Sequence, residues 1–180
     1  LTSNKHKTGT DRIHEALKKS NIRDVDFIMN LQGDEPAIDI QDIVRLNDKM
    51  LQNPSKIGTL ASIIKENKNL KNENIVKVIT ENALGENNFP KGISFLRKSE
   101  RIDNIYHHIG VYCYSKDSLE KFVQLSQSKN EIENRLEQLR ALDNNIDINV
   151  SLAKSSPIGV DTKEDYLCLL YTSPSPRDIS

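Results

Sequence analysis

A short polar loop follows the first apolar run of the chain and carries side chains suited to binding a ligand. The run from Val25 to Leu31 is apolar, and Gln32-Gly-Asp-Glu-Pro36 ends it. In this loop Gly33 lets the backbone turn tightly, Asp34 offers a hard oxygen ligand for Mg²⁺, and Gln32 can both donate and accept hydrogen bonds. Ligands of open α/β sheets bind beyond the carboxyl ends of strands, so this loop is a candidate site. The alternative is an ordinary turn whose acid caps a helix.

A second acid, Asp161, has a similar setting, between a predicted strand and a predicted helix and after Gly159. Its simpler interpretation is an N-terminal helix cap. Two aspartates at strand ends of one sheet can converge on a single Mg²⁺ and a polyphosphate. The pair therefore indicates a metal site more strongly than either acid alone.

The segment Lys7-Thr-Gly-Thr-Asp-Arg12 places hydroxyl groups, a glycine and an arginine at the start of a predicted helix. Free backbone amides at a helix start favour anions, so Thr8, Gly9, Thr10 and Arg12 are candidates for a nucleotide contact. A plain capped helix explains the pattern equally well, because the segment is not a Walker motif.

Two adjacent histidines lie in the predicted strand that ends at Tyr114. Alternation places His108 on the same face as Tyr112 and Tyr114, and places His107 on the opposite face. Metal binding by the pair is disfavoured, since neighbouring strand residues point to opposite faces.

Composition excludes several classes of protein. The 180 residues contain 25 Lys plus Arg against 26 Asp plus Glu, so no basic field exists for holding nucleic acid. No apolar run approaches the roughly 20 residues that cross a bilayer, and the start of the chain has no signal-peptide core. We therefore expect a cytoplasmic protein without membrane or nucleic-acid partners. Cys113 and Cys168 are far apart and are expected to be reduced core residues.

Periodicity predicts alternating helices and strands. Helices are expected over residues 11–20, behind Thr10, and over 40–52, 115–124 and 131–142 and from 163 onward, and strands over 25–31, 57–64, 75–80, 92–97, 109–114 and 146–153. This order predicts an α/β fold with a largely parallel, Rossmann-like sheet flanked by helices and an antiparallel, strand-rich insertion. Residues 1–167 would form one partial domain. The Ser- and Pro-rich residues 168–180 are expected to be a non-native tail.

The ordered segments HxTGTDR, NLQGDEP, HHIGVYCY, RLEQLR and GVDTKED closely resemble the CMP-Kdo synthetases, also called 3-deoxy-manno-octulosonate cytidylyltransferases. The resemblance implies that the chain is a nucleotidyltransferase and has the α/β fold of that class of enzyme. It implies that the enzyme transfers CMP from CTP to Kdo and releases pyrophosphate, a step of lipopolysaccharide biosynthesis. It also implies that the enzyme uses Mg²⁺ as its cofactor and is a homodimer. The alternatives are an acylneuraminate-type cytidylyltransferase and a non-catalytic sugar-acid or nucleotide-binding protein.

The resemblance also implies roles for individual residues. Asp34 and Asp161 would be the catalytic Mg²⁺ ligands. The Kdo pocket would contain six residues: Gln32, Arg97, His108, Tyr112, Glu137 and Gln138. The loop Thr8-Gly9-Thr10 and Arg12 would form part of the nucleotide side. The family sequence around Arg97 usually reads YFSR, whereas here it reads Ser94-Phe-Leu-Arg97.

Members of this family open with a strand and an Arg- and Lys-containing loop that holds the triphosphate. This sequence shows neither feature before residue 8, so we expect an N-terminally truncated chain that is inactive by itself. One face of the predicted helix 131–142 is apolar and carries Ile132, Leu136 and Leu139. These residues would pack either in a dimer interface or in the core.

Overall fold

The computed structural model describes residues 2–6, 8–22, 24–33 and 37–154, together with the single positions 163 and 167. The helices are α1 (Gly9–Lys19), α2 (Ile40–Gln52), α3 (Lys68–Lys71), α4 (Lys116–Gln124), α5 (Lys129–Asn134) and α6 (Leu139–Asp143). The strands are β1 (Phe27–Asn30), β2 (Ile57–Ser62), β3 (Lys77–Thr80), β4 (Gly92–Leu96), β5 (Ile105–Ser115) and β6 (Ile148–Leu152). No helix in these ranges has both the length and the apolar character needed to cross a membrane.

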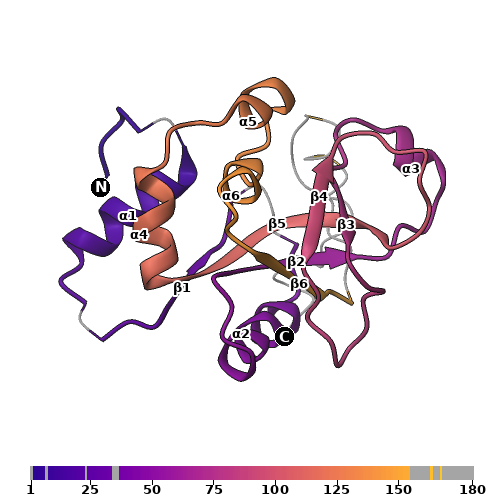
Figure 1. Ribbon diagram of the computed structural model, residues 1–180. Helices are drawn as coiled ribbons and strands as arrows, with labels where there is room; N and C mark the ends of the chain where they lie inside the picture. Colours follow the sequence, from indigo (N-terminus) through magenta and orange to yellow (C-terminus); the bar gives the residue numbers. More distant parts are fainter. Residues whose placement is uncertain are drawn as a thin grey trace.

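The six strands form one sheet in the order β4-β3-β5-β2-β6, and β1 pairs with β5 outside this path (Figure 1). β5 is the longest strand. β2 pairs with it from Ile57↔Tyr114 to Ser62↔His107, β1 pairs near its end at Asn30↔Tyr112, and β3 pairs near its start. Because β1 is antiparallel to β5, the chain that leaves β1 continues past Tyr112 toward Gly110. This register directs Gln32, two residues after β1, toward Gly110 in the middle of β5.

The expected α/β fold with flanking helices is confirmed, and the sheet is mixed. β1, β2, β3 and β6 share one direction, while β4 and β5 run against them. Among the described pairings only β2–β6 is parallel, because the antiparallel β5 lies between strands that would otherwise be parallel neighbours. The antiparallel strands expected in the middle of the chain are thus central to the sheet rather than an appendage.

Each face of the sheet carries its own apolar core. On one face Tyr112, Tyr114, Phe95 and Phe122 pack with residues of α4 and α6, and Figure 1 shows these helices on the side away from α2. On the other face α2 packs on Ile109, Val111 and Cys113, with Leu46 and Met50 as its buried side chains. Burial raises the pKa of the Cys113 thiol to about 11, so this cysteine is an inert core residue, as expected.

Side chains cap the starts of three helices. Thr8 caps α1, Asp39 caps α2 and Ser115 caps α4, each through a side-chain oxygen that accepts from a backbone N–H. The predicted helix 40–52 coincides with α2, and its caps explain why: Asp39 starts it and Pro54 follows its end.

One predicted helix is wrong. Residues 131–142 are not a single helix, because α5 ends at Arg135, whose φ of 53° lies in the left-handed region, and α6 begins only at Leu139. Leu136 and Leu139 are buried in the core, whereas Ile132 is 59% exposed, so the three do not form one helix face. Of the predicted helix after residue 162 the structure describes only positions 163 and 167, and the tail 168–180, with Cys168, lies outside the described residues.

Candidate functional site

A small cavity of about 60 Å³ opens where α1, the end of β1, β5 and the α5–α6 junction meet. Its lining consists of polar side chains and two tyrosines: Thr10, Asn30, Gln32, Tyr112, Tyr114, Glu137 and Gln138. These residues come from four segments that are far apart in the sequence. The cavity lies at the carboxyl end of β1, where the open α/β sheet was expected to bind its ligand.

The lining offers many hydrogen-bonding groups and only one formal charge. Gln32, Asn30 and Gln138 supply amides and the two tyrosines supply hydroxyls, while Glu137 supplies a carboxyl group. Burial raises the pKa values of both tyrosines, so their hydroxyls stay protonated and can donate. Such a set of neutral donors and acceptors suits a ligand rich in hydroxyl groups.

Gln32 reaches this cavity because β5 has a glycine where the two meet. A Cβ built on Gly110 would lie 3.2 Å from the Gln32 side-chain oxygen. Any side chain at position 110 would therefore push on the amide that lines the cavity.

Glu137 is the charged group of the cavity. Burial raises the pKa of its carboxyl group, while hydrogen bonds from Thr10 and Thr8 and the charge of Arg140 act in the opposite direction. Its Oε1 is buried and has no hydrogen-bond partner among the described residues, and Arg140 Nη2 lies 3.9 Å away. This oxygen is an acceptor available to a hydroxyl or another donor of a bound ligand.

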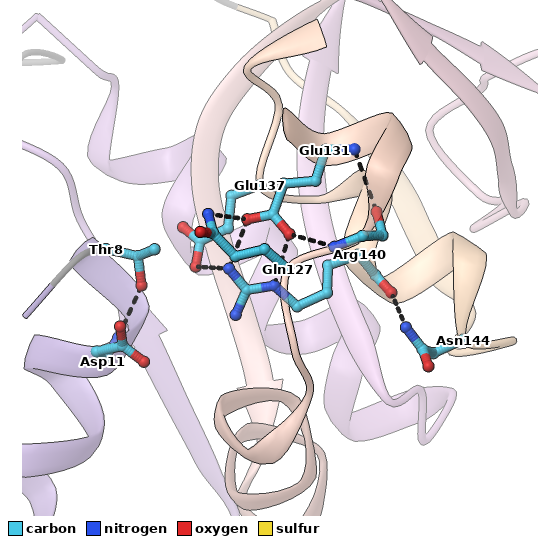
Figure 2. A network of polar contacts seen from close by, with 8 residues as sticks. Thr8, Asp11, Gln127, Glu131, Glu137, Arg140 and Asn144 are labelled. Atoms are coloured by element: carbon cyan, nitrogen blue, oxygen red, sulfur yellow. Dashed lines mark hydrogen bonds and ion pairs between the residues drawn. The ribbon is translucent and has the colours of Figure 1, made fainter. Parts of the chain in front are cut away.

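A buried ion pair supports the segment that carries Glu137 (Figure 2). Arg140 donates to Glu131 through Nε at 2.8 Å and through Nη2 at 2.5 Å, and each side chain is only 4% exposed. Glu131 also accepts from Gln127 and from the backbone of Ser128, which completes a capping box at the start of α5. The bidentate pair fixes α6 against α5, and thereby fixes the turn between them that presents Glu137 and Gln138.

His108 lies beside the cavity rather than in its lining. Its ring contacts Tyr112 with centroids 5.5 Å apart and Phe95 edge-on at 5.1 Å, which confirms the predicted face shared with the tyrosines. Burial, with the neighbouring His107, lowers the pKa of His108 to about 3, so the ring is neutral. Its Nε2 lies 3.0 Å from the hydroxyl of Thr59.

Arg97 does not line the cavity; it binds backbone carbonyls instead. Nε donates to Asn134, Nη2 to Arg135 and Nη1 to Glu73, at 3.0 to 3.1 Å. The carbonyl of Arg97 in turn accepts from Nζ of the buried Lys77 at 2.6 Å. Arg97 therefore joins the end of β4 to the left-handed turn after α5.

The predicted nucleotide-side residues separate in the structure. Thr10 is buried and lines the cavity together with the expected Kdo residues, while Thr8 accepts from the N–H of Asp11 as the helix cap. Gly9 and Arg12 are exposed on α1. Thr10 thus connects the start of α1 to Glu137.

Asp34 and Asp161, the predicted Mg²⁺ ligands, lie outside the described residues. Within those residues no group of three or more His, Cys, Asp or Glu side chains could hold a metal ion. Gln32, two positions before Asp34, lines the cavity. Carboxylate oxygens are the ligands that Mg²⁺ prefers, so the donor chemistry of the two aspartates fits this ion.

Comparison with known proteins identifies the family. The sequence profile described as Cytidylyltransferase matches residues 1–148. The 3-deoxy-manno-octulosonate cytidylyltransferase of Bartonella tribocorum (strain CIP 105476 / IBS 506) is 38% identical over 168 residues, which cover 92% of this chain and 68% of that protein. The chain belongs to the 3-deoxy-manno-octulosonate cytidylyltransferases. The protein of that name from Brucella ovis (strain ATCC 25840 / 63/290 / NCTC 10512) is also 38% identical, with 92% and 66% coverage. This cytidylyltransferase chain therefore spans about two thirds of the length of these relatives.

Solved structures agree with this assignment. A CMP:2-keto-3-deoxy-manno-octonic acid synthetase complexed with CTP superposes on this cytidylyltransferase with a TM-score of 0.78 at 29% identity, over 94% of this chain and 71% of that one. An apo UDP-glucose pyrophosphorylase superposes with a TM-score of 0.63 at 14% identity, over 93% of this chain and 60% of that one, and shows the shared fold alone.

Sequence reasoning did not find every residue at the site of this cytidylyltransferase. Asn30 and Tyr114 line the cavity but were not among the candidates, although Asn30 ends the apolar run before Gln32 and Tyr114 shares the predicted face of Tyr112. Thr59 and Arg140 support His108 and Glu137 from neighbouring elements. Arg140 was visible in the sequence as the last residue of the RLEQLR segment. No sequence pattern indicated Thr59, because its contact with His108 depends on the register of β2 against β5.

Proposed function

We propose that this chain forms the sugar-acid pocket of an enzyme that transfers CMP from CTP to Kdo and releases pyrophosphate. One observation carries the proposal. Gln32, Tyr112, Glu137 and Gln138, four of the six residues that the family resemblance assigned to Kdo, line one cavity. His108, a fifth, contacts Tyr112 through its ring.

The chain's own residues would bind and orient the sugar. An eight-carbon acid sugar presents several hydroxyl groups, and the amides of Gln32 and Gln138 can bind these as donors and acceptors. The buried Oε1 of Glu137 would accept from one hydroxyl group. Transfer of a nucleotidyl group depends chiefly on placing the attacking oxygen in line with the phosphorus, so rigid support of this pocket is the protein's main contribution.

The arrangement of Arg97 suggests that it contributes to this rigidity. Its three bonds to carbonyls hold the turn after α5, from which Glu137 follows two residues later. We also propose that Arg97 binds the Kdo carboxylate, because a guanidinium pairs well with a carboxylate. To make this contact, Arg97 would have to release at least one of the backbone carbonyls that it now binds.

Mg²⁺ belongs to the same proposal, with Asp34 and Asp161 as its ligands. A bound Mg²⁺ would neutralise charge on the phosphates and orient the nucleotide. We also propose a homodimer in the cytoplasm, where the donor CTP is made; light scattering coupled to gel filtration tests the dimer.

Titration calorimetry with purified chain tests the sugar specificity. Kdo and N-acetylneuraminate are titrated separately, and we expect heat of binding for Kdo and at least tenfold weaker binding of the nine-carbon acid. Glu137→Gln should weaken Kdo binding, whereas the control Glu133→Gln, on the exposed side of α5, should leave it unchanged. Equal binding of both sugars, or preference for N-acetylneuraminate, would contradict the proposal. Pyrophosphate release after addition of CTP and Mg²⁺ measures whether the chain also completes the reaction.

A further inference from the structure

The hydroxyl group of Thr59 lies inside the sheet, between β2 and β5, and has three polar neighbours. Its Oγ1 is 2.8 Å from the carbonyl oxygen of Val111, 3.3 Å from that of Ile109 and 3.0 Å from Nε2 of His108. Thr59 is fully buried and His108 is 7% exposed. The Thr59 hydroxyl therefore has these three groups, and not bulk water, as its partners.

Counting protons in this group fixes the direction of each hydrogen bond. A threonine hydroxyl has one proton to donate and two lone pairs with which to accept. The carbonyl oxygen of Val111 has no proton and lies 2.8 Å from Oγ1, a distance at which two oxygen atoms need a proton between them, so the hydroxyl proton goes to Val111. The contact with His108 is then a hydrogen bond only if Nε2 carries a proton and donates to Oγ1.

The register of the two strands explains why Thr59 can make this contact. β2 pairs with β5 from Thr59↔Tyr112 directly to Leu60↔Ile109, so two residues of β5 bulge at this point. The bulge turns the carbonyls of Ile109 and Val111 toward the same hydroxyl group. The rings of Phe95 and Tyr112 both contact the imidazole ring.

We propose that Thr59 is a positioning residue that fixes His108 as the tautomer protonated on Nε2, so that His108 offers Nδ1 as a hydrogen-bond acceptor. The ligand group that His108 recognises would then be a donor, namely a sugar hydroxyl, and not a carboxylate or phosphate. The recognition step rests on the proposed function; the tautomer does not. The lowered pKa of His108 agrees, since a neutral ring has one donor and one acceptor nitrogen.

The tautomer is measured directly in the free protein. Long-range ¹H–¹⁵N correlation spectra of the chain labelled with ¹⁵N-histidine distinguish a protonated from an unprotonated ring nitrogen, and His108→Gln assigns the signals. We expect a protonated Nε2 and an unprotonated Nδ1 for His108, unchanged from about pH 5 to pH 8. A protonated Nδ1, or an imidazolium in this range, would overturn the proposal.

Two variants test whether Thr59 is the cause. Thr59→Ser keeps the hydroxyl group and should keep the Nε2–H tautomer. Thr59→Val keeps the shape and removes the acceptor, so both tautomers should be present in similar amounts, and Kdo binding should weaken about twofold because only the Nε2–H fraction is competent to bind. An unchanged single tautomer in Thr59→Val would show that Thr59 does not fix the ring. Because the spectra need no sugar, a chain that fails to bind Kdo would refute the proposed function and leave the tautomer result valid.

Discussion

Replacing Arg140 by methionine tests how the fold supports Glu137. Arg140 and Glu131 form a bidentate pair, and both side chains are 4% exposed. Methionine fills much of the same volume but removes the cation, which leaves the Glu131 carboxylate buried without its partner. The guanidinium also lies 4.7 Å from the centre of the Phe122 ring, and this contact is lost as well.

The expected loss in the free energy of unfolding is about 3–5 kcal/mol, because removing one partner strands a buried charge. Loss of the contact with the Phe122 ring adds to this cost, since a desolvated cation–π contact contributes about 2 kcal/mol. Against a typical domain stability of about 5–15 kcal/mol, this loss brings the variant close to unfolding. The double variant Glu131→Gln/Arg140→Met should be more stable than Arg140→Met alone, since no unpaired charge remains.

The pH dependence provides a second readout. In the folded chain, burial acts to raise the pKa of Glu131, but Arg140, Gln127 and the Ser128 backbone together outweigh it, so its pKa is lowered from 4.5. The pair's contribution is therefore present above the unfolded pKa and is lost as pH falls through the folded pKa. In Arg140→Met the cation is absent and burial raises the pKa instead. The difference in the free energy of unfolding between the wild type and Arg140→Met should therefore become smaller as pH falls from 7 toward about 5.

Urea unfolding followed by circular dichroism at pH 7 and pH 5 measures both effects. Glu133→Gln is the matched control, because its ion pair with Lys129 is on the same helix but exposed, and it should cost less than about 0.5 kcal/mol. A loss below about 1 kcal/mol in the free energy of unfolding of Arg140→Met at pH 7 would contradict a supporting role for the ion pair. A difference from the wild type that is larger at pH 5 than at pH 7 would contradict it as well.

Three further substitutions test packing within the sheet and at the cavity. Lys77→Met should cost about 1–3 kcal/mol in urea unfolding, because the fully buried lysine donates to two carbonyl groups that would lose their donor. Gly58→Ala should cost about 1–3 kcal/mol in the same assay, since its Cβ would lie 2.7 Å from the Met50 sulfur. Gly110→Ala should leave the free energy of unfolding nearly unchanged. It should weaken Kdo binding in calorimetry by roughly twofold to tenfold, because the new methyl group displaces the end of the Gln32 side chain. Unchanged binding would show that Gln32 does not contact Kdo.

Local chemistry made most secondary structure predictable. α2 coincides with the predicted 40–52 because Asp39 caps its start and apolar residues recur at helical spacing. The interruption at Arg135 was not predictable, since the periodicity of Ile132, Leu136 and Leu139 is helical although the backbone turns left-handed between them. That turn is held by tertiary contacts, including Arg97 on the carbonyls of Asn134 and Arg135, which no local pattern encodes.

The candidate site was predictable where its residues belong to family segments. Gln32, Tyr112, Glu137 and Gln138 come from three such segments and meet in one cavity. Partners that depend on strand register were not predictable: Thr59 meets His108 only because β2 and β5 pair with a bulge. The place of β5 between β1 and β2 was likewise not predictable, because the expected largely parallel sheet has no antiparallel strand at its centre.

Titration of Kdo into the ¹⁵N-labelled chain tests whether the cavity is the Kdo pocket, because it shows where the sugar binds. The account predicts saturable shifts at Gln32, Tyr112 and Gln138, the residues around the cavity. It predicts no shifts around Lys71 and Lys98, which line a separate surface hollow. Shifts confined to that hollow, or no shifts at all, would contradict the assignment of the cavity as the Kdo pocket.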